Sequence, residues 1–150
     1  MKKVLLSVLL LMFTVSLSFA QQIVFIDIKT IVEKSEAGKQ AQAILEKEAK
    51  EAQKFIETKA KLIKQGDMKA QQELQQLAQQ KQQELVKRRQ EIIQDFMGKV
   101  EEALNKFAKK NNFLLVLDKQ AVLYGKPELD KTDEFLKFFN EEYKKGKKLK

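Results

Sequence analysis

The chain has 150 residues, and its 29 Lys or Arg against 21 Asp or Glu leave a formal charge of +8. It contains no Cys, no His and no Trp, and a single Pro. This composition excludes a disulfide framework, a thiol nucleophile, a zinc site built from Cys and His, and a Ser–His–Asp triad. We therefore expect a protein that is not an enzyme and that uses no metal or cofactor.

The first 20 residues have the pattern of a secretory signal peptide. Lysines occupy positions 2–3, residues 4–15 form an almost unbroken apolar run, and Ser18 and Ala20 place small side chains three and one before a cleavage point. The apolar run is shorter than the ~20 residues that span a bilayer, which favours removal over anchoring. We expect secretion and cleavage after Ala20, which leaves a mature chain with a formal charge of +6.

Three short apolar segments of the mature chain are predicted strands, namely residues 22–28, 113–117 and 121–124. The first two are apolar on both alternating faces, which predicts burial on both sides. Residues 118–120 would form the turn between the second and third strands. Gly125 and Pro127 would end the third strand, because Pro cannot donate to a ladder.

Between the first two strands lies a long segment that is predicted to be helical. Residues 35–111 contain no Pro and are rich in Ala, Gln, Glu, Lys and Leu, which are strong helix formers. Apolar residues recur every three or four positions, in a stripe narrow enough for a coiled-coil seam. A break is expected near residues 65–67, where a glycine can end one helix and an aspartate can cap the next. The segment therefore predicts an antiparallel hairpin arm, with helices over residues 35–64 and 68–111.

The two predicted arm helices differ in length. We expect that residues 29–34 lengthen the first helix and that the second helix continues beside the strands. Gly98 either marks a bend where arm and body meet or is tolerated at a cost of about 1 kcal/mol relative to Ala. Residues 132–148 predict a final helix, capped by Thr132 or Asp130, whose apolar face covers one side of the sheet.

These elements predict self-association. Three strands of about five residues cannot form a stable sheet alone, because their edges stay unpaired. Closing the small sheets of several copies into a barrel would remove those edges. We therefore expect an α+β protein, mostly α, with a β-rich oligomerisation body from residues 21–34 and 112–150 and an arm from residues 35–111. The side chains expected between copies are Val24, Ile26, Leu115, Leu117, Val122 and Tyr124.

The order of these segments resembles the Skp/OmpH family of periplasmic chaperones over essentially the whole mature chain. The most specific parts are LVLDKQAVLY at residues 115–124 and LDKTDEF at residues 129–135, although Lys131 stands where the family usually has an apolar residue. The resemblance implies a jellyfish-like homotrimer, with a β-barrel body and three hairpin arms around a cavity. It also implies an ATP-independent holdase in the periplasm, which keeps unfolded outer-membrane β-barrel proteins soluble.

The composition of the arm fits such a holdase. Residues 54–89 contain nine Lys or Arg and four acidic residues, and the resulting charge of +5 can attract clients over a long range. Apolar side chains near the tip either offer patches to a client or pack between the helices of the hairpin. The basic arm can also contact anionic lipid or lipopolysaccharide. The predicted client-binding residues are Phe55, Lys59, Lys61, Leu62, Lys64, Met68, Lys69, Lys87, Arg88 and Arg89.

Three other functions are compatible with parts of the sequence. A structural or adaptor coiled coil in the periplasm would dock a folded partner. The positive charge would suit nucleic acid, but no groove-reading motif is present and the leader directs the chain away from the cytoplasm, so we expect no specific nucleic acid. A carboxylate enzyme such as a glycosidase needs two acids in a pocket. Asp27 and Asp118 fit strand-end and turn positions better.

Overall fold

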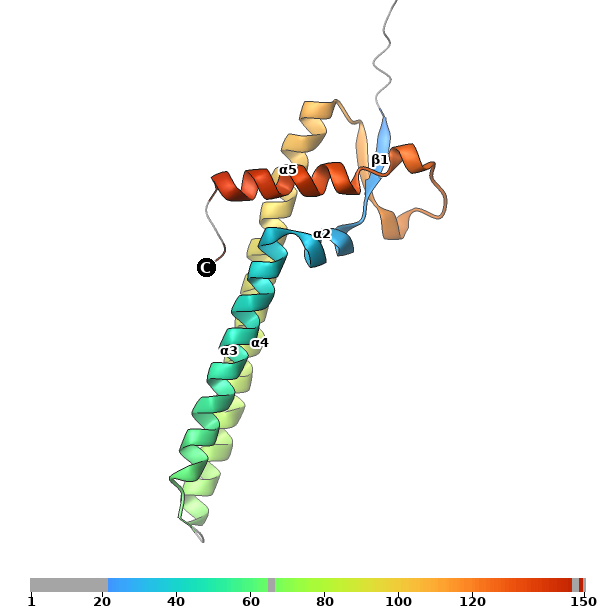
Figure 1. Ribbon diagram of the computed structural model, residues 1–150. Helices are drawn as coiled ribbons and strands as arrows, with labels where there is room; N and C mark the ends of the chain where they lie inside the picture. Colours follow the sequence, from blue (N-terminus) through green and yellow to red (C-terminus); the bar gives the residue numbers. More distant parts are fainter. Residues whose placement is uncertain (1–21, 65–66, 147–148, 150) are drawn as a thin grey trace, which may run out of the picture.

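The computed structural model describes residues 22–64, 67–146 and 149, and in it a long two-helix arm projects from a small body (Figure 1). The predicted signal peptide lies outside the described residues. The elements in chain order are β1 (Ile23–Ile26), α2 (Ile28–Lys34), α3 (Glu36–Lys61), α4 (Met68–Asn111), β2 (Leu115–Asp118), the 3₁₀ turns η2 (Lys119–Ala121) and η3 (Pro127–Leu129), and α5 (Thr132–Lys145).

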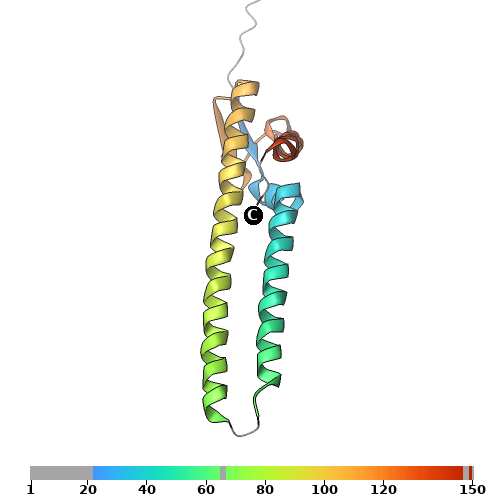
Figure 2. The same cartoon turned by 90° about the vertical axis from the view of Figure 1, so that its left-hand side faces the viewer.

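The arm is the antiparallel hairpin that the sequence predicts, formed by α3 and α4 side by side (Figure 2). Helix α4 spans the predicted residues, and α3 ends at Lys61, three residues before the predicted end. The Asp67 carboxylate caps α4 by accepting from the Ala70 N–H at 3.0 Å. Asn112, with φ of 59°, ends the same helix in the left-handed conformation. Local capping chemistry therefore sets the bounds of the longer arm helix.

The root of the arm differs in one respect from the prediction. Residues 29–34 are helical, but they belong to the separate helix α2 and do not lengthen α3. Ser35 separates the two helices, because its backbone is extended (φ −68°, ψ 154°) and its Oγ accepts from the Gly38 N–H at 3.0 Å. The other expectation is confirmed, since α4 continues into the body and buries Phe96 and Phe107 there.

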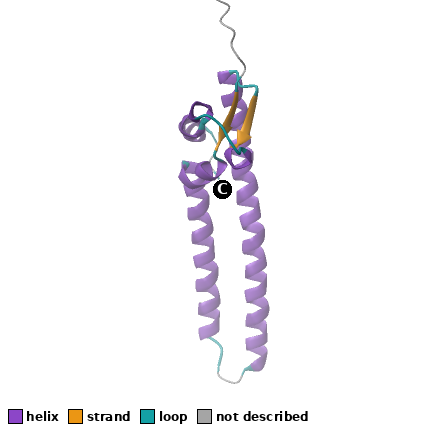
Figure 3. Ribbon diagram, turned by 90° about the vertical axis from the view of Figure 1, so that its right-hand side faces the viewer, coloured by secondary structure: helices purple, strands orange, loops and turns teal. Residues whose placement is uncertain are grey.

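The sheet is smaller than predicted. Within the described residues it has two strands, β1 and β2, which pair in parallel with Ile23 opposite Leu115, and it lies at the body end of the molecule (Figure 3). A parallel pair needs a long crossover, and here the crossover is the whole arm. The predicted burial on both faces is confirmed for β1, where residues 24–26 are buried, whereas Leu115 and Leu117 of β2 are exposed in the single chain.

The predicted third strand over residues 121–124 is wrong. The Asp118 carboxylate accepts from the Gln120 N–H at 3.1 Å and winds residues 119–121 into the 3₁₀ turn η2. The following residues are irregular, and β1 instead makes a single bridge from Phe25 to Asp130. An aspartate that bonds its own backbone two residues on competes with strand formation, and within the described residues neither β1 nor β2 pairs with this segment to oppose it.

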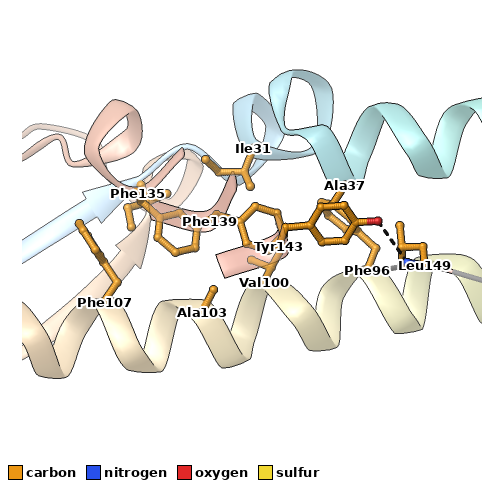
Figure 4. Close-up of a cluster of buried hydrophobic side chains, with 11 residues drawn as sticks. Ile31, Ala37, Phe96, Val100, Ala103, Phe107, Phe135, Phe139, Tyr143 and Leu149 are labelled. Atoms are coloured by element: carbon orange, nitrogen blue, oxygen red, sulfur yellow. Dashed lines mark hydrogen bonds between the residues drawn. The ribbon is translucent and has the colours of Figure 1, made fainter. Parts of the chain in front are cut away.

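The core lies where α5 crosses α4, at the upper end of the arm (Figures 1 and 4). Phe135 and Phe139 of α5 are fully buried, and the Phe139 ring meets Phe96 edge to face with centroids 6.0 Å apart. Phe107 packs against Phe135 with centroids 5.5 Å apart. The predicted apolar face of α5 is therefore confirmed, but it covers chiefly α4 and meets the sheet mainly at β1.

The first turn of α5 is tied to the start of α2. The predicted cap at Thr132 or Asp130 is wrong, because the N-cap residue of α5 is Lys131, which makes no side-chain cap hydrogen bond. The Asp130 carboxylate instead accepts from the N–H of Thr132, the first residue of the helix, at 3.0 Å. The Thr132 hydroxyl in turn accepts from the Asp27 N–H at 2.9 Å. Burial opposes ionisation of Asp130, but hydrogen bonds from Lys119 and Thr132 outweigh it and lower the pKa of this carboxyl. The network holds together two helix starts that are far apart in sequence.

Two glycines of the arm helices provide a matched test of this packing. A β-carbon at Gly38 would lie 1.9 Å from the Val32 carbonyl oxygen, whereas one at Gly98 would meet nothing within 4 Å. We expect Gly98→Ala to stabilise the protein by about 1 kcal/mol, because Ala is the better helix former. We expect Gly38→Ala to destabilise it by about 2 kcal/mol or more, because the backbone at the α2–α3 junction must shift. Urea unfolding followed by circular dichroism measures the change in the free energy of unfolding for both variants. A change of the same sign in the two variants would contradict the packing described.

Candidate functional site

The arm exposes most of its side-chain surface. Among the described residues from 39 to 91, no side chain is buried. Half-buried positions recur at steps of three and four and form the seam between the helices; they are Ala41, Ile44, Leu45, Glu48, Ala52 and Ile56 on α3, and Ala70, Leu74, Leu77, Ala78, Lys81, Leu85 and Arg88 on α4. The seam is thus thin, and several of its members are small or charged. A two-helix arm of this kind has no apolar core of its own.

A cross-arm ion pair forms part of this seam. The Arg88 Nε donates to the Glu48 Oε1 at 3.0 Å, and Arg88 also contacts Glu91 at 3.4 Å. The hydrogen bond to Glu48 raises the pKa of Arg88 further above its usual range, although desolvation opposes this. The predicted client-binding residue Arg88 is therefore engaged between the helices, whereas its neighbours Lys87 and Arg89 are exposed.

The predicted apolar residues of the arm divide into two groups. Ile56 and Ile63 are half-buried, which fits packing between the helices. Phe55, Leu62 and Met68 expose 39, 74 and 75% of their surface and are available to a partner. The sequence therefore identified exposed apolar side chains on the outer half of the arm, of which Phe55 borders the seam.

Phe55 lies on a groove between α3 and α4. The ammonium groups of Lys59 and Lys81 sit 5.7 and 5.6 Å from the centre of its ring. Ala52, Phe55 and Leu85 are the apolar lining of the groove, which has a volume of about 510 Å³ and a rim of Glu and Lys or Arg side chains. The groove therefore offers apolar contact and both signs of charge within one short length of arm.

The net positive charge of the chain is concentrated on the outer part of the arm. Of the formal charge of +8, residues 54–89 carry +5. The predicted basic residues there are exposed, namely Lys59, Lys61, Lys64, Lys69, Lys87 and Arg89. Like charges this close repel one another, so they favour an extended arm and a strong local potential.

The body also exposes a set of large apolar side chains, and we call this set the apolar face. Ile23 pairs with Leu115 in the sheet, and Leu117 follows on the same side of β2 because side chains alternate along a strand. Leu123 and Tyr124, in the segment after η2, expose 105 and 86% of their surface. The set consists of Ile23, Leu114, Leu115, Leu117, Leu123 and Tyr124. Exposed apolar side chains in such number are typical of interaction surfaces.

The apolar face changes the list of expected interface residues. Leu115, Leu117 and Tyr124 are exposed as an interface requires, and Val122 is half-buried. Val24 and Ile26 are buried within the single chain, where their side chains stabilise its own core. Strand alternation predicted burial on both faces of β1, but it did not show that the remainder of the same chain would provide it.

Sequence reasoning missed several exposed apolar residues. Ile23, Leu114 and Leu123 belong to the apolar face, and Val86, Ile93 and Met97 lie exposed along α4. The last three are spaced by seven and four residues, on a helix face offset from the seam. This second set of helical spacings, beside that of the seam, is the sequence signal from which these exposed residues could have been predicted.

No catalytic constellation is assembled in the described part of the chain. Asp27 caps α2, and the hydroxyl of Thr30 lowers the pKa of its carboxyl while burial opposes the shift. Asp118 caps η2, so both candidate acids are used by the backbone. Within residues 22–64, 67–146 and 149, no three acidic side chains are grouped to hold a metal ion. None of the described helices combines the length and apolar character of a membrane crossing.

Comparison with known proteins decides the family. A family model described as "Outer membrane protein (OmpH-like)" matches residues 22–139, which include both strands, the arm and most of α5. The chain belongs to the OmpH-like family. The resemblance noted at residues 115–124 and 129–135 is thereby confirmed.

A solved structure shows the fold shared within the OmpH-like family. It is that of a candidate outer membrane chaperone (OmpH-like) from Caulobacter crescentus CB15, which is 16% identical to this chain. The match covers 80% of this chain and 84% of that chain, with a TM-score of 0.55. No curated protein matches the sequence. At this identity the likeness establishes the architecture of a body with a long helical hairpin.

Two phenylalanines test whether the OmpH-like arm keeps its apolar groups free. Phe55→Ala on the arm is expected to lower the free energy of unfolding by about 1 kcal/mol or less, because the Phe55 ring is partly solvated. Phe139→Ala in the body is expected to cost about 3–5 kcal/mol, because a fully buried ring leaves a cavity. Urea unfolding at one fixed protein concentration measures the free energy of unfolding of both variants. Equal losses would show that Phe55 belongs to a structural core.

Proposed function

We propose that this OmpH-like protein is an ATP-independent periplasmic holdase. It binds unfolded outer-membrane β-barrel proteins along its arm and keeps them soluble until they reach the outer membrane. Family membership and the fold shared with a candidate outer membrane chaperone support a chaperone role in general. The leader that ends at Ala20 supports export to the periplasm.

The observation that carries this proposal is the absence of any buried side chain among the described residues from 39 to 91. A helical segment of this length would normally bury one apolar stripe. Here that stripe is thin, and Phe55, Leu62 and Met68 remain exposed. An arm without a core gains little folding stability from its own contacts, so we interpret its exposed surface as a binding surface. Many weak contacts along such a surface suit a client that is unfolded and has no fixed shape.

The chemistry of the arm matches that of the proposed client. Strands of an outer-membrane barrel alternate apolar and polar residues, so an unfolded strand presents both kinds of group at short intervals. The Phe55 groove has an apolar lining and a charged rim. The charge of +5 on residues 54–89 would increase the rate of encounter with acidic segments and would be screened by salt.

The apolar face supports assembly of several copies into a trimer. Within the described residues, β1 and β2 form a two-stranded sheet, and a sheet of this size is unstable in isolation. Joining copies through Leu115, Leu117, Leu123 and Tyr124 would cover apolar surface and would provide partners for unpaired edges. Three arms that project from one body would then surround a cavity for the client.

The holdase function is tested by diluting a urea-unfolded outer-membrane protein into buffer without nucleotide and recording light scattering. We expect the protein to suppress aggregation, less effectively at high salt. A variant with Lys61, Lys64 and Lys69 changed to Gln should need several-fold more protein for the same suppression.

The matched control for the tip variant changes Lys109, Lys126 and Lys137 to Gln, which removes the same charge near or in the body. This control should suppress aggregation like the unchanged protein. Scattering that rises equally with and without the protein would end the proposal. Tight stoichiometric binding to one folded protein, without suppression, would instead support an adaptor.

Assembly is tested separately with Leu123→Asp, because this fully exposed side chain has no packing role in the protomer. We expect its native mass to fall from a multiple of the chain mass to a single chain, since a buried carboxylate would oppose association. Leu62→Asp at the arm tip is the control and should keep the assembled mass. Native mass spectrometry measures both. An unchanged protein that is monomeric at micromolar concentration would contradict the proposed assembly.

A further inference from the structure

Helix α4 carries a row of exposed, uncharged side chains along most of its length. The members follow one another at steps of three or four residues, which places them on one face of the helix. Arg89 borders this row, and Glu101 follows it toward the body. We call it the neutral row; it has apolar side chains at Met68, Val86, Ile93 and Met97, and glutamines at positions 72, 75, 79, 82 and 90.

A different face of α4 is charged. Exposed side chains recur there at steps of three, four or seven residues, and all but Gln80 carry a charge; the charged members are Lys69, Glu73, Glu84, Lys87 and Glu91. The last three line the Phe55 groove, and no member of the neutral row does. The arm thus offers two surfaces of different chemistry, a charged one beside the groove and an uncharged one along α4.

The neutral row has the length and spacing of a membrane-spanning β-strand. From Met68 to Met97 it rises by about 44 Å at ~1.5 Å per residue. A strand of about 9–11 residues in an outer-membrane barrel is roughly 30–37 Å long. Alternate side chains of that strand are roughly 6.7 Å apart, and neighbouring members of the row differ in height by about 4.5–6 Å. One extended strand therefore fits along the row with the side chains of one face against it.

The chemistry of the neutral row is complementary to the lipid-facing side of such a strand. An unfolded strand has unpaired backbone N–H and C=O groups, and each glutamine amide offers both a donor and an acceptor. The apolar members of the row suit the lipid-facing side chains, which alternate with polar ones along the strand. A charged side chain in the row would lose hydration against those apolar groups without gaining a partner. The absence of charge is therefore the property that this client surface requires.

We propose that the neutral row is a binding site for the apolar side of an extended strand of an unfolded outer-membrane protein. This inference rests on the proposed holdase function and assigns different tasks to the two surfaces of the arm. The basic residues attract acidic segments over a long range, and salt screens that attraction. The neutral row holds apolar segments at short range, so its contribution to client affinity persists at high salt.

Adding positive charge to the neutral row tests the site. A variant with Gln75, Gln79 and Gln82 changed to Lys keeps good helix formers in α4. If electrostatic attraction alone held the client, this variant would bind an acidic client more tightly. We expect instead that its affinity for a fluorescently labelled, urea-unfolded outer-membrane protein falls about tenfold at high salt, because the new ammonium groups must be desolvated. Fluorescence anisotropy after dilution from urea measures the affinity.

The matched control changes Ala43, Thr58 and Gln80 to Lys, which adds the same charge at exposed positions of the arm outside the neutral row. Its affinity at high salt should stay within about twofold of that of the unchanged protein. Equal affinities of the row variant and the control would overturn the inference. A native mass of the row variant below that of the unchanged protein would also overturn it, because a second copy of the chain would then cover the row.

A second variant removes the apolar members without adding charge. Val86, Ile93 and Met97 are changed to Gln, which is at least as good a helix former as Val or Ile. We expect several-fold weaker binding at high salt, and affinity equal to that of the unchanged protein would contradict the site. If both row variants suppress aggregation like the unchanged protein, the holdase proposal stands and the neutral row is not its site. If the unchanged protein itself does not bind the unfolded client, both proposals are overturned.

Discussion

The packing of α5 across α4 is the interaction on which the rest of this protein depends. The arm buries no side chain among its described residues from 39 to 91, so it gains little stability from its own contacts. Phe135 and Phe139 bury their rings against the part of α4 that runs through the body. Because α4 is continuous from body to tip, this one aromatic cluster supports the whole arm. Helix formation is cooperative, so a firmly held end stabilises the turns beyond it.

The thin seam and the proposed holdase activity follow from one property of the sequence. Alanine, glutamine and charged residues favour helices but form few apolar contacts between helices. The two arm helices therefore pair while leaving most of their side-chain surface exposed. Glu48 and Arg88 form an ion pair between the helices where a coiled coil would normally place two apolar side chains. Such a pair favours a particular register of the helices without burying a core. Apolar groups such as Phe55 and Leu62 consequently stay available on the arm.

The body differs from the arm, because it has a buried core and still leaves large apolar side chains exposed. Over the part of the chain that the structure describes, its sheet has two strands, and neither pairs with the segment that carries the exposed Leu123 and Tyr124. The Asp118 cap winds the chain away from strand geometry at this point. Association between copies would resolve both features, because it covers apolar side chains and supplies edges for pairing.

The sequence by itself determined the arm and its ends. Helical spacing, the cap at Asp67 and the absence of Pro from residues 35–111 act over a few neighbouring positions, so they can be read along the chain. Motifs after residue 114 also indicated the family. The tertiary structure alone decided that the rest of the same chain covers β1, that residues 121–124 make no strand, and that Leu149 contacts Gln40. These outcomes depend on partners about a hundred residues away or on the presence of a neighbouring strand, and no local pattern carries that information.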